Sequence, residues 1–218
     1  MIAGLDLVVP AGEVHGVVGP NGAGKTTLLE AIYGFVPTRR GTITLRGVRP
    51  DARSTAYLPT ENYFYPRMTG REYLRIFRAR APAFDADAWA ELFDLPLDRF
   101  VDEYSAGMKK KLALIATLSL DRAAILLDEP SNNLDVESNL LLAQVVRQLA
   151  EAGRIVLVTS HILEALTSAC DRIHLLRGGR VARTFGRGEF GELERALVGG
   201  DGAVKHAKVR ALLRGGAA

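Results

Sequence analysis

Two adjacent carboxylates, Asp128 and Glu129, end the stretch AAILLDE at residues 123–129, directly after an apolar run. Such a run predicts a buried strand, and unpaired charge at its end carries a high free-energy cost. Solvated acids that cap a following helix are one interpretation. The other is a pair that holds a metal ion and activates water, which is the chemistry of phosphoryl transfer and requires a phosphate ligand.

A glycine-rich segment predicts the site for that phosphate. Residues 19–27, GPNGAGKTT, match G-x-x-x-x-G-K-[ST] between an expected strand at 14–18 and an expected helix from Lys25 to about Gly34. Such a loop surrounds a phosphate with backbone N–H groups, and the helix directs its positive end at the anion. A glycine turn beside a surface lysine is the alternative. The candidate nucleotide-binding residues are Gly19, Pro20, Asn21, Gly22, Ala23, Gly24, Lys25, Thr26 and Thr27.

In a protein with such a loop, the two acids have separate roles. We expect Lys25 to contact the β and γ phosphates, and Thr26 and Asp128 to hold Mg2+. Glu129 is expected to orient or deprotonate the attacking water, a role worth about 10²- to 10⁴-fold in rate. A magnesium nucleotide is therefore the expected ligand.

Four further segments resemble the nucleotide-binding subunit of an ATP-binding-cassette (ABC) transporter, and the resemblance covers roughly residues 1–185. The segments are YLPTENYFYPRMT at 57–69, where the family has its glutamine-containing loop; YSAGMKKKLALIA at 104–116, similar to its signature loop and helix; SNNLD at 131–135, similar to the loop after the catalytic glutamate; and VLVTSH at 156–161, similar to the strand that ends in the switch histidine.

The resemblance implies ATP and Mg2+ as ligands and a head-to-tail dimer, expected to be a homodimer, with two nucleotides between the chains. His161 would contact the γ-phosphate and the attacking water, and Asp135 would lie at the dimer seam. Ser105 by itself is also a good helix N-cap. The residues expected to serve the ATP of the second subunit are Ser105, Ala106, Gly107 and Met108.

Several positions depart from the family pattern. Thr60 occupies the position where the family usually has glutamine, and Glu61 or Asn62 is a candidate to replace the function of that glutamine. Ala106 and Met108 stand where glycine and glutamine are usual. In the family, an aromatic residue that stacks on adenine precedes the loop lysine. Here Lys25 is too close to the first residue of the sequence to leave room for it. Either the first strand is missing from this chain or adenine is held another way.

The loop Tyr63–Met68 contains three aromatic residues and a methionine around Pro66, and it is more apolar than a free loop needs. We expect it to contact a separate integral membrane permease. A loop folded over the local core is the alternative. The resemblance implies ATP hydrolysis that energises transport by a chain peripheral on the cytoplasmic face of the cell membrane, and the signature segment favours export as the direction.

The order of apolar runs predicts an α/β fold with a mostly parallel sheet and a small antiparallel β portion, and the resemblance implies that this is a P-loop ABC ATPase core. A helical subdomain is expected at about 66–120, inserted in a single domain of residues 1–185, with a tail at 186–218. Further strands are expected at 42–46, 56–58, 124–128 and 155–159, a hairpin at 172–176 and 180–185, and helices at 136–152 and 192–198.

Composition excludes several classes of protein. The 218 residues carry a net charge of +3, which is too mild to favour nucleic acid as a partner, and we expect the lysines at 109–111 and the basic residues Lys205 to Arg214 to be solvated. No apolar stretch reaches the ~20 residues of a membrane span. The single cysteine fits a reducing cytosol. Two alternative functions stay open: an ABC ATPase acting on nucleic acid or the ribosome, and a small-molecule kinase.

Overall fold

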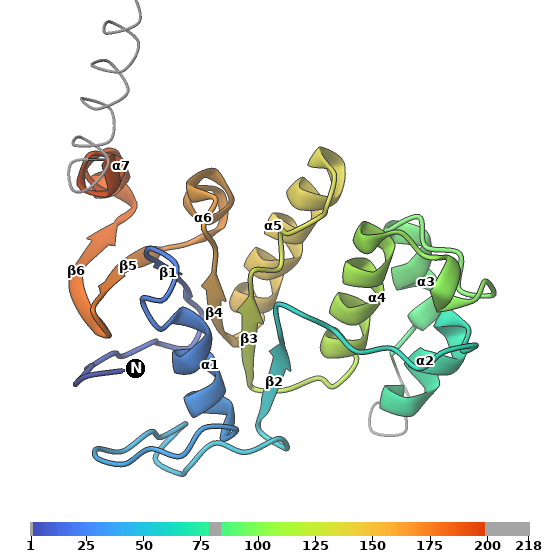
Figure 1. Ribbon diagram of the computed structural model, residues 1–218, viewed down its shortest axis with the longest axis horizontal. Helices are drawn as coiled ribbons and strands as arrows, with labels where there is room; N and C mark the ends of the chain where they lie inside the picture. Colours follow the sequence, from blue (N-terminus) through green and yellow to red (C-terminus); the bar gives the residue numbers. More distant parts are fainter. Residues whose placement is uncertain (1, 79–83, 199–218) are drawn as a thin grey trace, which may run out of the picture.

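The computed structural model describes residues 2–78 and 84–198. Within these ranges six strands form one sheet in the order β2-β3-β4-β1-β5-β6 (Figure 1). Neighbours are parallel except β5 and β6, which form an antiparallel hairpin. The expected mostly parallel sheet is therefore confirmed. The strands are β1 (Val14–Val18), β2 (Thr55–Leu58), β3 (Ala124–Asp128), β4 (Ile155–Thr159), β5 (Arg172–Arg177) and β6 (Arg180–Gly186).

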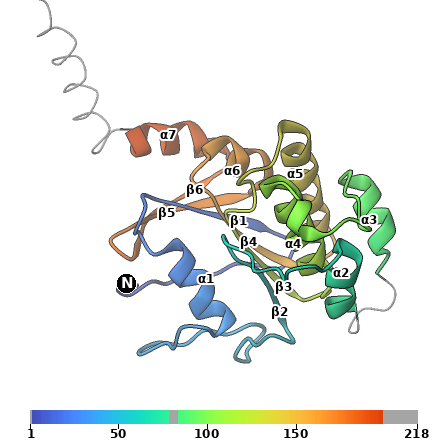
Figure 2. The same ribbon diagram turned by 45° about the vertical axis from the view of Figure 1, so that its right-hand side comes forward.

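Helices cover both faces of this sheet (Figures 1 and 2). Leu126 of β3 packs with Leu29 of α1 on one face, and the next residue, Leu127, belongs to the cluster that includes Val146 of α5 on the other. Successive strand residues point to opposite faces, and helices cover both faces here. Every residue of β3 before Asp128 is therefore apolar. The helices are α1 (Lys25–Tyr33), α2 (Gly70–Arg78), α3 (Ala86–Leu92), α4 (Ala106–Leu118), α5 (Val136–Glu151), α6 (Leu163–Ala169) and α7 (Phe190–Val198), with 3-10 turns η1 (Val101–Glu103) and η2 (Arg187–Glu189).

Helices α2, α3 and α4 lie together beyond the β2 edge of the sheet (Figure 1). Tyr104 fixes their connections, because its hydroxyl donates to the carbonyl of Pro96 at 2.6 Å. A Cβ at Gly70 would lie 2.4 Å from that hydroxyl, so the close approach of α2 requires glycine. Among the helices of the described residues, none combines the length and apolar character needed for a membrane span.

Two segments differ from the sequence-based expectations. The prediction of a strand at 42–46 is wrong. Arg46 and Gly47 both have positive φ and turn the chain back, so Leu45 forms only an isolated bridge with Val48. Beyond residue 185 the fold continues, since β6 extends to Gly186 and Leu193 of α7 is fully buried. The basic residues Lys205, His206, Lys208, Arg210 and Arg214 lie outside the described residues.

A buried histidine pair ties β1 to β5. His15 Nδ1 lies 2.9 Å from His174 Nε2, and the chain of hydrogen bonds continues to Glu13 from His15 and to Thr184 from His174, each at 2.8 Å. If Nε2 of each ring carries the proton, His15 donates to Glu13, His174 donates to His15, and the Thr184 hydroxyl donates to His174. Every ring nitrogen of the pair then has a hydrogen-bond partner.

Candidate functional site

The phosphate loop lies between β1 and α1, as the sequence predicts. Gly24, the N-cap of α1, has a φ of 105°, a conformation that favours glycine. The first turn of α1 contains no acidic residue, so its positive end is available to an anion. Lys25 is buried, and its Nζ donates to the carbonyl of Gly19 at 2.9 Å. This bond folds the lysine back over the loop.

Three threonine hydroxyls surround the carboxylate of Asp128, which is fully buried at the end of β3. Thr26 Oγ1 donates to Asp128 Oδ2 at 2.7 Å, and Thr60 Oγ1 donates to the same oxygen at 2.9 Å. Thr159 Oγ1 donates to Oδ1. Thr60 and Thr159 meet Asp128 because β2, β3 and β4 are parallel neighbours whose carboxyl ends lie at one edge of the sheet. Thr26 reaches the same carboxylate from the first turn of α1.

The same threonine of β4 also holds the backbone of Glu129. The N–H of Glu129 donates to Thr159 Oγ1 at 3.0 Å and to the Thr159 carbonyl at 3.2 Å. Glu129 has a φ of 49°, in the left-handed region that residues other than glycine rarely adopt. Strained backbone of this kind concentrates at functional sites. The chain therefore leaves the extended conformation of β3 at Glu129.

Glu129 contacts two of the predicted site residues. Its Oε2 lies 2.8 Å from Nδ1 of His161 and accepts from the His161 backbone N–H at 3.1 Å. Its Oε1 lies 3.9 Å from Nζ of Lys25, and both side chains of that pair are nearly buried. The structure therefore brings together the phosphate loop, the acid pair and the histidine.

The residues present fit a magnesium ion. Magnesium prefers hard oxygen ligands and is usually held by one or two carboxylates together with substrate phosphates and water. Thr26 and Asp128 supply a hydroxyl and a carboxylate beside the phosphate loop. In the described part of the chain no group of three or more His, Cys, Asp and Glu side chains could hold a metal alone. The hydroxyl of Thr26 and the carboxylate of Asp128 thus suit a metal shared with a bound nucleotide.

The segment Ser105 to Met108 lies apart from this cluster. Ser105 caps α4, because its Oγ accepts from the N–H of Met108 at 3.1 Å. A Cβ at Gly107 would lie 2.6 Å from the carbonyl of Asn133, so this glycine is needed for close packing on the loop after Pro130. Among the described residues, no hydrogen bond or ion pair joins Ser105–Met108 to Gly19–Thr27.

A second contact ties the start of α4 to the loop that precedes α5. Lys111 Nζ lies 3.5 Å from Asp135 Oδ2, and Asp135 caps α5 through a bond of 2.7 Å from the N–H of Ser138. That backbone bond is the main cause that lowers the pKa of Asp135 to about 2. Asp135 therefore stays ionised at neutral pH, next to the signature segment.

The aromatic loop divides into two parts. Phe64 packs on Tyr73 with ring centroids 4.9 Å apart, and Met68 also packs on the core. Tyr63 and Tyr65 instead point outward, with 73% and 53% of their surfaces exposed, and their rings meet edge to face. Folding over the core thus accounts for Phe64 and Met68, while Tyr63 and Tyr65 keep an exposed aromatic surface.

Three residues of the site carry contacts that sequence reasoning did not assign. Thr60 itself reaches Asp128, whereas Asn62 Nδ2 donates to the carbonyl of Pro59 at 3.3 Å. Thr159 was predictable, because it ends the strand before His161. Lys110, expected to be solvated, is only 4% exposed, and this expectation is wrong. Helical spacing gives the missing signal, since Lys110 shares a face with the buried Leu114.

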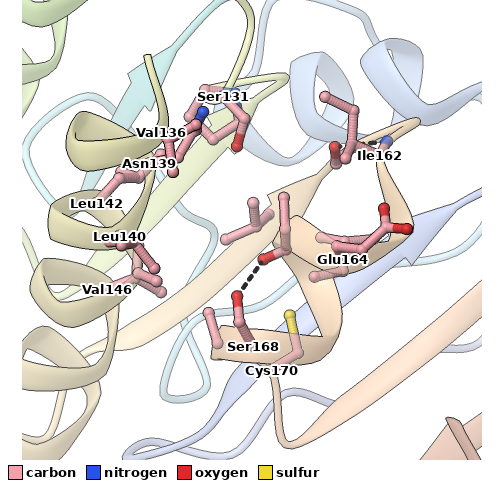
Figure 3. A pocket seen from close by; sticks show the side chains of 17 residues that line it. Ser131, Val136, Asn139, Leu140, Leu142, Val146, Ile162, Glu164, Ser168 and Cys170 are labelled. Atoms are coloured by element: carbon pink, nitrogen blue, oxygen red, sulfur yellow. Dashed lines mark hydrogen bonds between the residues drawn. The ribbon is translucent and has the colours of Figure 1, made fainter. Parts of the chain in front are cut away.

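A pocket of about 380 Å³ lies between α5 and α6 (Figure 3). Its lining includes Pro130 and Ser131, which follow Glu129, and Ser160 and Ile162, which flank His161, so the pocket borders both of these loops. Cys170 forms part of its wall, and burial raises the pKa of this thiol to about 12. A thiol with that pKa is protonated at neutral pH and unreactive.

Comparison with known proteins shows the family to which this chain belongs. A model of the ABC transporter family matches residues 2–132, which is more than half of the chain. The chain belongs to the ABC transporter family. Within that family it is similar to ATP-binding subunits. The ABC transporter ATP-binding protein YtrB of Bacillus subtilis is 33% identical over 197 residues, which cover 86% of this chain and 68% of the relative.

Other ABC relatives include proteins named for export. The Nod factor export ATP-binding protein I of Burkholderia lata is 34% identical, over 83% of this chain and 64% of its own length. The ABC transporter ATP-binding protein NatA of Bacillus subtilis is 32% identical, over 81% of this chain and 78% of its own length. This chain therefore spans less than two thirds of the first of these two ABC proteins.

Solved structures confirm the fold. An ATP binding subunit of an ABC transporter is 28% identical and superposes with a TM-score of 0.75, covering 87% of each chain. A bacterial ABC transporter cassette described as dimeric is 20% identical, with a TM-score of 0.77 over 85% of this chain and 90% of that chain. The ABC cassette fold expected from the sequence is thus confirmed.

Proposed function

We propose that this ABC subunit hydrolyses Mg·ATP and that Glu129 and His161 are its catalytic residues. The observation that carries the proposal is the position of Glu129, between Nζ of Lys25 and Nδ1 of His161 and directly after the buried Asp128. The acid therefore stands where a γ-phosphate bound by the lysine would meet an attacking water. A base in this position supplies about 10²- to 10⁴-fold of rate.

The chain's own residues divide the work. Lys25 leaves the Gly19 carbonyl for the phosphates, while the loop N–H groups and the positive end of α1 bind the same anion. Thr26 and Asp128 would hold magnesium, which neutralises charge on the phosphates when it is bound. Glu129 accepts the proton of the attacking water. While Glu129 is ionised, His161 donates from Nδ1 to Oε2, which orients the acid.

The separation of the signature segment supports a head-to-tail dimer of two such chains. Ser105–Met108 forms a capped helix start, mostly exposed, without a bond to the phosphate loop of the same chain. A helix start of this kind attracts anions. In a dimer it would meet the γ-phosphate of ATP bound by the second subunit. The dimeric relative is consistent with this arrangement.

Transport through a separate integral membrane permease, with export as the direction, completes the proposal. The exposed pair Tyr63 and Tyr65 gives the permease an aromatic surface next to the loop that carries Thr60. The subunit would then be peripheral on the cytoplasmic face of the membrane. Export is supported by the names of relatives such as the Nod factor protein.

Phosphate release by the purified chain tests the activity. Turnover should require both ATP and Mg2+ and should be lost in EDTA and in Lys25→Ala. For the partner, the full chain is purified from native membrane with and without Tyr63→Ala and Tyr65→Ala. A multi-span protein that accompanies only the unaltered chain supports a permease. Hydrolysis stimulated by nucleic acid, with steep salt dependence, would instead support the nucleic-acid function.

A further inference from the structure

Lys110 is a buried lysine on the helix that starts with the signature segment. Its side chain runs from α4 toward the end of β2, where Nζ donates to the carbonyl of Thr60 at 2.8 Å and, less closely, to the carbonyl of Pro59 at 3.4 Å. Only 4% of the residue is exposed. Lysine is almost never buried to this extent without partners. The two carbonyls are those partners.

The residue that Lys110 holds is the one that contacts Asp128. Thr60 accepts from Lys110 through its carbonyl and donates through its hydroxyl to Asp128 Oδ2 at 2.9 Å. The same oxygen accepts from Thr26, so the bonds link Lys110 to both expected magnesium ligands. Threonine is two carbons shorter than glutamine, and its hydroxyl reaches Asp128 only if the backbone of the loop stays close. Lys110 fixes that backbone.

The charge of Lys110 also acts on the acid pair. Burial lowers the pKa of Lys110, and the negative charges of Asp128 and Glu129 offset only part of this shift. Lys25 and Lys110 thus place two basic side chains near Asp128, which is fully buried, and Glu129, which is nearly so.

We propose that Lys110 is a positioning residue for the magnesium site: it holds Thr60 against Asp128 and so couples the signature helix to the metal ligands of the same chain. The inference rests on the proposed function, because it assigns the metal to Thr26 and Asp128. Residues outside the ligand shell that orient ligands typically change metal affinity by about 10- to 100-fold when they are removed. A lysine that only filled space would leave metal affinity unchanged.

Binding of Mn2+ in the presence of ADP, followed by electron paramagnetic resonance of the full chain, tests this role without hydrolysis. Lys110→Met should raise the Mn2+ dissociation constant roughly tenfold. Lys109→Met, one position earlier on α4, is the matched control and should leave it unchanged. Thr60→Val should raise it by a similar factor, and the double variant should bind little worse than either single variant, because both remove one connection.

The alternatives have distinct outcomes. Unchanged Mn2+ affinity in Lys110→Met, or fully additive effects with Thr60→Val, overturns the role of Lys110 while the proposed function stands. Failure of the unaltered chain to bind Mn2+ with ADP contradicts the proposed function itself. If Lys110→Met does not fold, Lys110→Leu removes the hydrogen-bond donor with a smaller apolar side chain. A loss of Mn2+ affinity in that variant supports the role, and unchanged affinity opposes it.

Discussion

Oε2 of Glu129 lies 2.8 Å from Nδ1 of His161, and the same oxygen accepts the backbone N–H of that histidine. Two strands therefore fix one carboxylate oxygen, because Glu129 follows β3 and His161 follows β4. The other oxygen, Oε1, faces Lys25 at 3.9 Å. One side of the carboxylate is held by the protein, and the other is directed at the phosphate loop.

Glu129→Gln should reduce ATP turnover by roughly 10²- to 10⁴-fold, because an amide cannot accept the proton of water. ATP binding should persist, since Lys25 and the loop are unchanged, and an ATP-bound dimer should accumulate. Phosphate release and light scattering during size-exclusion chromatography measure the two effects. Glu137→Gln, at an exposed position of α5, is the control. Turnover near normal in Glu129→Gln would remove Glu129 from its catalytic role.

Asp128→Asn should weaken magnesium-dependent turnover more than Thr60→Val. The first variant removes the buried negative charge, whereas the second removes one of three hydroxyls that contact it. A lost hydrogen bond to a charged group costs about 1.5 to 3 kcal/mol. The Mg2+ concentration for half-maximal turnover measures both, with the exposed Thr44→Val as control. The reverse order of severity would contradict the assignment of Asp128 as metal ligand.

A mixture of Lys25→Ala and Ser105→Arg chains should recover activity that neither variant has alone. Each mixed dimer contains one intact composite site, so equal mixing with random pairing should restore about a quarter of the turnover of the unaltered chain. Phosphate release at a fixed total concentration of chains measures the recovery. Mixing two preparations of the same variant is the control. The absence of any recovery would count against head-to-tail pairing.

Stability should fall as the pH drops from about 6.5 to about 4 because of His174. Burial, followed by the charges of His15 and Arg172, lowers the pKa of His174 to about 4, whereas the unfolded value is 6.5. Within this window the unfolded chain binds a proton that the folded chain does not, so acid favours unfolding. The full effect is about 3 kcal/mol, because each tenfold difference in proton affinity is worth about 1.4 kcal/mol.

Urea unfolding at pH 7 and pH 5 measures this loss. His174→Gln should lose less stability between the two pH values than the unaltered chain, although it is less stable at pH 7. The exposed Thr44→Val should keep the unaltered pH dependence of unfolding. Equal pH dependence in the unaltered chain and in His174→Gln would show that the buried pair does not control it.

The chemistry at the sheet edge was predictable because each residue ends a continuous apolar run. Asp128 and His161 follow short apolar runs that contain β-branched residues and favour buried strands, and parallel strands bring their carboxyl ends together. Lys110 was not predicted, because three consecutive lysines are typical of a solvated face. Helical spacing from the buried Leu114 favours Lys110 as the lysine that turns inward, and the packing of α4 against the end of β2 supplies its partners.

The incorrect prediction of a strand at 42–46 has a different cause from the incorrect prediction for Lys110. Its residues alternate as a strand would, but a strand is stable only when a neighbour pairs with it. Here the turn at Arg46 and Gly47 leaves a single bridge. At the other end, Leu193 is one buried leucine in a short helix, a signal too weak to extend the domain past residue 185.

The left-handed backbone at Glu129 sets stability against activity. A residue with a Cβ in this region costs of order 1 kcal/mol or more, and glycine removes most of that cost. Glu129→Gly should therefore give an inactive chain whose backbone at this position is more relaxed than in the active one. Stabilising substitutions selected without regard to turnover would favour glycine here, and the acid would persist only where hydrolysis is required.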